Sequence, residues 1–186
     1  MAQKATIFKC ELSVADMDRK YFATHALTLA RHPSETDERM MVRLLAFALN
    51  ASEALAFGRG LSSEDEADLT QRDLTGAIQL WVDVGLPDEK SLRKASGRAD
   101  RVIVYAYGGR SVDLWWSKNR NVLERLPNFF AFDVPLEASQ ALSRLAARTM
   151  QLQCTVQDGH LWFSSAKETV EVMLRPLLDS SSHLPS

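Results

Sequence analysis

Polar and apolar residues alternate in two regions of the chain, one at its beginning and one near its end. The first region contains Ala5–Val14 and Tyr21–Leu29, and its alternation predicts a β-hairpin. In the second, Gln151–Gln157 and His160–Ser164 flank Asp158-Gly159, a pair that readily forms a type I′ turn. This region therefore predicts another hairpin.

Helical spacing of apolar residues marks four further segments. The most regular is Ser34–Asn50, where Ser34 is the expected N-cap and acidic residues follow in the first turn. Residues 88–99 predict a short helix capped by Asp88, and residues 136–150 predict another helix. A helix is also expected around Trp115 and Trp116. These two tryptophans could stack on nucleic-acid bases, but packing in the core is the more common role of such a pair.

Four stretches between these helices have the composition of strands. Asp68–Asp73 and Ala77–Gly85 flank Leu74-Thr75-Gly76, whose glycine can adopt the positive φ of a tight turn, so they predict a hairpin. Arg101–Tyr107 is apolar enough to be buried on both faces and is the expected central strand. Asn128–Val134 predicts a further strand. The elements together indicate an α/β (α+β) protein.

Composition indicates one soluble domain. The chain has 186 residues, of which 46% are hydrophobic and 25% charged, values close to the globular average. A single domain over 1–186 is therefore expected, with a frayed Ser-rich tail at 179–186. No apolar run is long enough to span a bilayer, and Met1–Glu11 lacks the residue order of a signal peptide. These features predict a cytoplasmic protein with no membrane partner.

Cysteine and histidine residues give no sign of a zinc or redox site. Cys10 and Cys154, the two cysteines of the chain, lie in alternating, strand-like segments and belong to no CxxC motif or Cys/His group, so both are expected to be reduced structural thiols. The four histidines have no spacing typical of zinc ligands. No organic cofactor is expected either, because nucleotide-binding glycine motifs are missing from the sequence.

Basic residues concentrate in one part of a chain whose net charge is −2. Between Lys90 and Arg125 there are nine basic and three acidic residues, an excess of six positive charges. Such a stretch favours a phosphate-backbone partner, and a solvated helical face explains it equally well. The residues predicted to bind nucleic acid are Arg93, Arg98, Arg101, Arg110, Lys118 and Arg120.

Two aspartates on the predicted hairpin carry the main chemical hypothesis. With the turn centred on Thr75 and Gly76, Asp68 lies opposite Asp83, and facing Cβ atoms are about 4.5–5.5 Å apart. Two facing carboxylates repel each other, and a bound divalent cation would offset the repulsion. In the alternative interpretation Asp68 belongs to the solvated loop and Asp83 merely ends its strand.

Two acidic residues and one lysine could complete such a site. Glu38 borders the apolar stripe of the first helix and could point toward the sheet. Glu35 lies one turn earlier, where an exposed pair with Arg39 or an interaction with the helix dipole is a more common role than metal binding. Lys94 lies about one and a half turns into the helix that follows the Asp83 strand. Its ammonium could stabilise charge in phosphodiester hydrolysis or could simply be a surface cation.

Three long strings in the sequence resemble one bacterial family. They are ARHPSETDERMMVRLLA (Ala30–Ala46), LWVDVGLPDEKSLRKA (Leu80–Ala95) and CTVQDGHLWFS (Cys154–Ser164), and the resemblance runs from Ala5 to Val172. The chain resembles the YaeQ family. This resemblance implies a variant of the PD-(D/E)XK, or restriction-endonuclease-like, fold, with a mixed central sheet flanked by helices.

The resemblance also implies a set of site residues and an activity. The helical acidic position falls on Glu38 or Glu35, the "PD" position on Asp68 and the "(D/E)" position on Asp83. Ala67 replaces the proline of the pattern, and Gly85 replaces its lysine, for which Lys94 is the matching candidate.

Three functions from different classes remain open. The first is a Mg²⁺- or Mn²⁺-dependent nuclease in which Asp68, Asp83 and Glu38 bind the metal and Lys94 assists. The second is a non-catalytic nucleic-acid-binding or transcription-associated module that keeps the fold. Transcription or repair partners are conceivable on either hypothesis, and a purely structural or protein-interaction domain is the third alternative.

Overall fold

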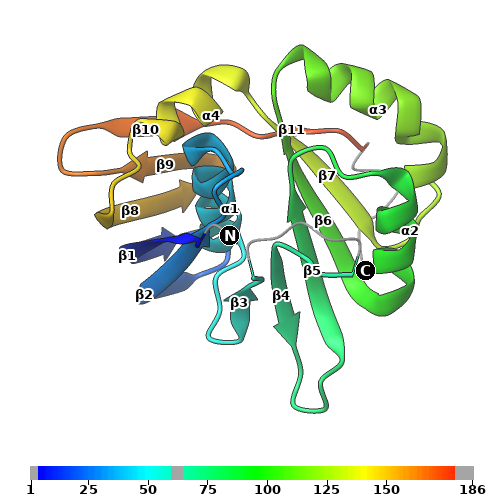
Figure 1. The fold of residues 1–186 in the computed structure, drawn as a ribbon, viewed down its shortest axis with the longest axis horizontal. Coiled ribbons are helices and arrows are strands. Elements are labelled where there is room, and N and C mark those ends of the chain that lie inside the picture. Colours follow the sequence, from blue (N-terminus) through cyan, green and yellow to red (C-terminus); the bar gives the residue numbers. More distant parts are fainter. Residues whose placement is uncertain (1–3, 60–64, 179–186) are drawn as a thin grey trace. The chain divides into compact units, whose positions relative to one another are not determined.

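Two separate sheets organise the chain, where one central sheet was expected (Figure 1). The computed structural model describes residues 4–59 and 65–178. Residues 4–51 and 137–173 form the first unit, and the remaining described residues form the second. Each unit contains one mixed sheet, so the α+β class is confirmed. The single domain over 1–186 stays a prediction, and its tail at 179–186 lies outside the described residues.

The first unit is built on a five-stranded sheet with the order β10-β9-β8-β1-β2. Within this sheet β1 and β8 are parallel, and the other neighbours are antiparallel. Its elements are β1 (Thr6–Asp16), β2 (Tyr21–Arg31), α1 (Asp37–Leu49), α4 (Leu136–Ser143, from its second residue on), β8 (Thr149–Gln157), β9 (His160–Ser164) and β10 (Thr169–Val172).

Alternation along the strands explains why this sheet has one buried face. In β1 the side chains of Phe8, Cys10, Leu12 and Val14 are buried, and the residues between them are more exposed. Both predicted hairpins of this unit are confirmed. The second turns at Asp158 and Gly159, whose φ angles of 51° and 76° are those of a type I′ turn.

Two predicted helix limits in the first unit are wrong. Helix α1 begins at Asp37 because Thr36 is the N-cap and accepts a hydrogen bond from Arg39 N, whereas the Ser34 hydroxyl bonds to His32. The predicted helix over 136–150 ends at Ser143. Its last residues belong to β8, because pairing with β1 satisfies their backbone groups and buries Met150.

The second unit is built on a six-stranded sheet with the order β11-β7-β6-β5-β4-β3. Strands β5, β6 and β7 are parallel, and β6 lies between two neighbours, as predicted for an apolar strand. The elements are β3 (Leu55–Phe57), β4 (Leu69–Arg72), β5 (Ile78–Val84), α2 (Glu89–Arg98), β6 (Ala99–Tyr107), α3 (Arg110–Leu123), β7 (Phe129–Val134) and β11 (Arg175–Pro176).

Helices α2 and α3 cover one face of this sheet. Their buried residues form a single cluster with Val102 and Val104 of β6 and with neighbouring strands. Trp115 and Trp116 belong to this cluster and are each 9% exposed, and the indole N–H of Trp115 donates to the Pro87 carbonyl at 2.7 Å. Burial leaves neither ring open for base stacking. Among the described residues, no helix has both the length and the apolar character needed to cross a membrane.

The two cysteine thiols are expected to be unreactive in the folded protein. Cys10 and Cys154 are 2% and 0% exposed, and burial raises the pKa of each thiol to about 12. Because the thiolate is the reactive form, neither should react with a disulfide reagent at pH 8. Ellman's reagent should therefore detect two thiols in urea and none in buffer within minutes. Rapid reaction of the native protein would contradict this assignment.

Candidate active site

The hairpin of β4 and β5 brings Asp68 and Asp83 together. Leu69 pairs with Val82 and Thr70 pairs with Trp81, which is the register predicted from the turn. Asp68 directly precedes β4, so continuing this register sets it opposite Asp83 on β5. A bulge at Gln71/Arg72 shifts the register only toward the turn, and it leaves the end that carries the aspartates unchanged.

Hydrogen bonds hold both carboxylates in fixed positions. The backbone N–H of Asp68 donates to Asp83 Oδ1 at 3.2 Å, and the indole N–H of Trp81 donates to Asp83 Oδ2 at 2.9 Å. The backbone N–H of Val84 donates to Asp68 Oδ2 at 2.8 Å. These N–H donors restrict the two side chains to one arrangement.

The two aspartates provide the oxygen donors that Mg²⁺ and Mn²⁺ prefer. A carboxylate oxygen that accepts one hydrogen bond keeps a second lone pair for a metal ion. Mg²⁺ is commonly held by one or two carboxylates together with several waters. In the part of the chain that the structure describes, no three His, Cys, Asp or Glu residues gather closely enough to bind a metal. A metal ion held by this pair alone would need waters or substrate oxygens for the rest of its coordination.

Gly58, which follows β3, contacts the backbone of Asp68 on the side away from β5. Its backbone N–H donates to the Asp68 carbonyl at 2.8 Å, and a Cβ added at Gly58 would lie 2.2 Å from the Ala67 carbonyl oxygen. Only glycine allows the two backbones to approach this closely. The loop at Gly58 is thereby positioned against the residue that carries the first carboxylate.

Backbone geometry explains why no lysine follows Asp83 at the expected spacing. Gly85 has a φ of +94°, a conformation that L side chains rarely adopt, and its N–H donates to the Tyr105 carbonyl at 3.0 Å. A lysine at this position would strain the chain as it leaves β5. The missing lysine is thus a consequence of how the strand ends.

Lys94 lies on α2, as predicted, and its ammonium binds Asp65. The Lys94 Nζ is 2.7 Å from Asp65 Oδ1, and both side chains are well exposed. The hydrogen bond from Lys94 lowers the pKa of the Asp65 carboxyl group. Asp65 lies three residues before Asp68 and was missed by the sequence analysis because the acidic loop offered no pairing pattern. The role of Lys94 in catalysis stays a prediction.

The two candidate glutamates belong to the first unit and differ in their partners. Both carboxylate oxygens of Glu35 accept hydrogen bonds from Arg43, at 2.7 and 2.8 Å, and Arg39 also bonds to Glu35. Glu35 is thus held in a buried ion pair. Glu38 accepts one hydrogen bond from Ser139, at 3.3 Å. Glu35 is the poorer metal ligand of the two, because two guanidinium groups already neutralise its charge, and a metal role for Glu38 stays a prediction.

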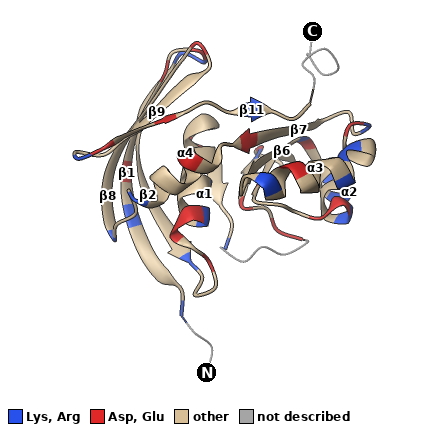
Figure 2. Cartoon of the chain, turned by 90° about the horizontal axis from the view of Figure 1, so that it is seen from above, with Lys and Arg blue, Asp and Glu red and all other residues tan. Residues whose placement is uncertain are grey.

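The six cations predicted to contact nucleic acid do not form one continuous basic surface. Arg93 and Arg120 pair with Glu89 and Glu124 on their own helices, and Figure 2 shows acidic and basic residues mixed on α2 and α3. Arg101 adjoins Val102, whose side chain faces the helices, so Arg101 lies on the opposite sheet face, over the Phe130 ring.

The other three cations all lie on α2 and α3. The Arg98 guanidinium lies over the Trp81 ring, and the remaining two, on α3, are Arg110 and Lys118. Nucleic-acid binding by the six residues stays a prediction.

Asp133 is a further buried acid that the sequence analysis missed. It lies on β7 beside Ala106, on the sheet face that also carries Asp83, two strands away. Arg175 joins it to Asp113 on α3, with Nη2 2.9 Å from Asp133 and 2.8 Å from Asp113. The second Asp133 oxygen is buried and has no hydrogen-bond partner among the described residues. The partners come from distant segments, so no local pattern could reveal them.

The chain is similar to bacterial proteins over nearly its whole length. The family described as "YaeQ protein" matches residues 1–174. The chain is 45% identical over 174 residues to "Uncharacterized protein YaeQ" of Salmonella typhi, and the match covers 94% of this chain and 96% of that protein. For the protein of the same name in Escherichia coli (strain K12) the identity is 44% with the same coverage.

Solved structures show the same similarity in three dimensions. The crystal structure of YaeQ protein from Xanthomonas axonopodis pv. citri has a TM-score of 0.89 and 46% identity, covering 92% of this chain and 97% of that one. The YaeQ protein from Pseudomonas syringae has a TM-score of 0.89 and 35% identity, covering 95% and 97%. The fold is therefore shared with experimental structures.

Proposed function

Since this chain belongs to the YaeQ family and carries two facing aspartates on one hairpin, we propose that it is a divalent-metal-dependent nuclease. The proposal includes a distant relationship to the restriction-endonuclease-like fold. Its main support is the pairing of Asp68 with Asp83, because two rigidly held carboxylates match the ligand preference of Mg²⁺ and Mn²⁺. The proposed substrate is a phosphodiester of DNA or RNA.

In this proposal Asp68 and Asp83 bind the cation, and surrounding groups keep them in place. A bound divalent ion supplies a Lewis acid that polarises a phosphoryl oxygen and makes a water molecule more acidic. Trp81 and the backbone N–H of Val84 are positioning groups, because they orient the carboxylates without contacting a substrate. Because the carboxylates are already oriented, little free energy is spent on rearranging them when the ion binds.

Replacing Asp83 with asparagine is expected to abolish cleavage. Purified protein with Mn²⁺ should cleave single- or double-stranded DNA or RNA, and Asp83→Asn should lower the rate by about 100-fold or more, equivalent to ~2.7 kcal/mol. Gel analysis of labelled substrates measures this directly. Asp100→Asn, which removes an exposed carboxylate from β6, is the matched control and should leave the rate unchanged. Equal activity of Asp83→Asn and the parent protein would assign the cleavage to a contaminant.

A non-catalytic nucleic-acid-binding module is the second candidate, and the partner of Lys94 favours it. The Lys94 ammonium is engaged by Asp65, and Gly85 occupies the usual lysine position. A protein of this kind would bind nucleic acid in EDTA with an affinity that falls as salt rises. Asp65→Ala distinguishes the two candidates, because freeing Lys94 should raise the cleavage rate of a nuclease and leave a binding module inactive.

A further inference from the structure

One half of β8 lacks a strand on one side. β8 pairs with β1 from Thr149 to Val156, but it pairs with β9 only from Gln153 to Gln157. β9 ends at Ser164, and the chain then turns into β10. Within the described residues, Thr149–Leu152 therefore has a neighbouring strand on the β1 side alone. This leaves a gap in the sheet about as long as four residues of extended chain, ~13 Å.

The backbone groups of Thr149 and Gln151 point into this gap. Lys9 N donates to the Arg148 carbonyl at 2.9 Å, so the backbone of residue 148 faces β1, and that of the next residue faces away. The β8–β9 hairpin independently indicates the same direction for the backbone groups of residues 149 and 151. Gln157 and His160 close its two-residue turn, which directs residues 157, 155 and 153 toward β9, and residues 151 and 149 follow the same alternation.

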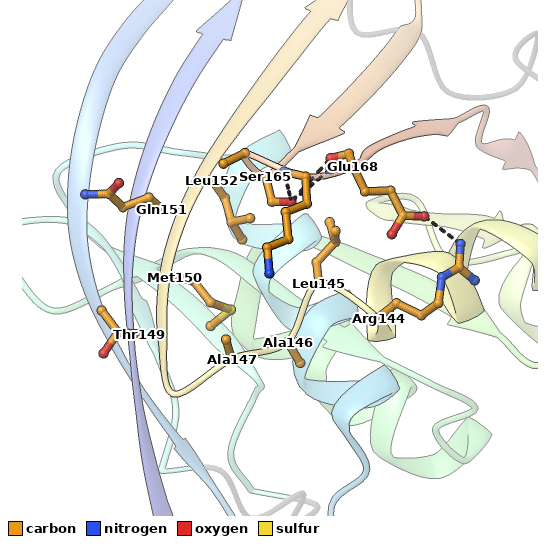
Figure 3. Close-up of a pocket in the computed structure, with 12 residues that line it drawn as sticks. Arg144, Leu145, Ala146, Ala147, Thr149, Met150, Gln151, Leu152, Ser165 and Glu168 are labelled. Carbon is orange, nitrogen blue, oxygen red and sulfur yellow. Dashed lines mark hydrogen bonds and ion pairs between the residues drawn. The ribbon is translucent and has the colours of Figure 1, made fainter.

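The gap is a pocket of about 630 Å³ with an apolar floor. Its floor is formed by the buried residues Leu145, Met150 and Leu152, whose side chains point into it in Figure 3. Residues 144–147 form one wall, and residues 165–168 form the other. Pockets of about 300–1,000 Å³ with apolar walls and a few polar groups are typical of ligand sites.

The pocket has one positive charge that is not neutralised locally. Arg144 and Glu168 form an ion pair of 2.7 Å at its edge, drawn as a dashed line in Figure 3. Lys167 also lines the pocket and is exposed. Across the described ranges, no carboxylate pairs with the Lys167 ammonium. A ligand with a single carboxylate would therefore have the most favourable electrostatic interaction with the pocket.

We propose that this gap binds an extended peptide segment as an added strand on β8, with a peptide carboxylate paired to Lys167. Donors and acceptors two residues apart on β8 match the repeat of an extended chain, and alternate peptide side chains would reach the apolar floor. A small organic anion would leave these backbone groups unpaired, and a nucleic acid would meet, among the described residues, a single cation, Lys167, that is not already paired with a carboxylate, since Arg144 is paired with Glu168. The site is independent of the proposed nuclease activity because all its residues belong to the first unit.

A random heptapeptide library displayed with free C-termini tests the proposal on the full-length protein. The expected result is enrichment of peptides that have alternating apolar or β-branched residues and a carboxylate. Affinities of synthetic versions should fall about tenfold for Lys167→Ala, which removes the charged partner. Peptides with an amidated C-terminus show whether the carboxylate is the chain terminus or an Asp or Glu side chain.

Gln151→Pro tests the added strand separately from the charge. Its N–H points into the gap, so proline removes a donor for the peptide and no hydrogen bond to β1. Peptide affinity should fall at least about tenfold with an unchanged circular dichroism spectrum. Lys20→Gly is the matched control for Lys167→Ala. It removes a lysine from the β1–β2 turn, where glycine accepts the φ of 55°, and the variant should bind peptide as tightly as the parent protein does.

Two results would overturn the proposal. One is a selection in which no peptide is enriched over a surface without protein. The other is a set of peptides that bind Lys167→Ala and Gln151→Pro as tightly as they bind the parent protein. Should Gln151→Pro fail to fold, the Lys167→Ala and Lys167→Glu pair decides the question, since charge reversal should weaken binding more than charge removal.

Discussion

Arg43→Met is expected to lower the free energy of unfolding of the first unit by about 3–5 kcal/mol, the cost of breaking a buried ion pair. The Arg43 and Glu35 side chains are 1% and 3% exposed, and Arg43 also donates to the Ala30 carbonyl at 3.1 Å. Methionine fills much of the space but leaves the Glu35 carboxylate buried, with Arg39 as its remaining ion-pair partner among the described residues. Urea unfolding followed by circular dichroism measures the change.

Two further variants show whether the buried pair is responsible. Arg39→Met removes the more exposed guanidinium and should cost about 1 kcal/mol or less. The double variant Glu35→Leu with Arg43→Met removes both charges and should recover most of the loss, because no unpaired charge remains. The assignment would be refuted if Arg43→Met were no more destabilising than Arg39→Met.

Asp68→Asn is expected to weaken Mn²⁺ binding by about 100-fold or more while the hairpin stays intact. Asparagine keeps an oxygen that can accept the hydrogen bond from Val84 N, but it removes the charge that attracts the ion. Isothermal titration with Mn²⁺ gives the affinity. Asp68→Ala should show the same loss of binding and, in addition, a destabilisation of about 1–3 kcal/mol, because the buried N–H of Val84 loses its partner.

The control for Asp68→Asn lies on the same hairpin. Asp73 is an exposed residue in the turn, where its carboxylate accepts hydrogen bonds from Thr75 and Ala77. Asp73→Asn removes the same charge and keeps a side-chain acceptor at the turn, so Mn²⁺ affinity should not change. An equal loss of Mn²⁺ affinity in Asp68→Asn and Asp73→Asn would point to general electrostatics and against a site at Asp68.

Several features of the candidate site could be predicted because they depend on neighbouring residues. The strand pairing predicted from alternation placed Asp68 opposite Asp83, and it is found from Leu69 to Gln71, while a bulge at Gln71/Arg72 takes up one residue next to the turn. The same alternation could have revealed Trp81, since residues two apart on a strand share a face. Asp65 could not be predicted in this way, because it lies in a loop without periodicity and its ion pair with Lys94 of α2 forms only when the chain folds.

The amino-acid order by itself determined the four helices and the longer strands, including the type I′ turn at Asp158-Gly159 and the central position of β6, but it did not reveal the short strands β3, β10 and β11. These features depend on periodicity and on the φ angles that individual residues accept. Tertiary structure alone decided that the strands divide between two sheets, that β8 replaces the end of a predicted helix, and that Glu35 is neutralised by Arg43. Each of these outcomes depends on partners distant in the sequence, whose competing pairings and burial are settled only when the whole chain folds.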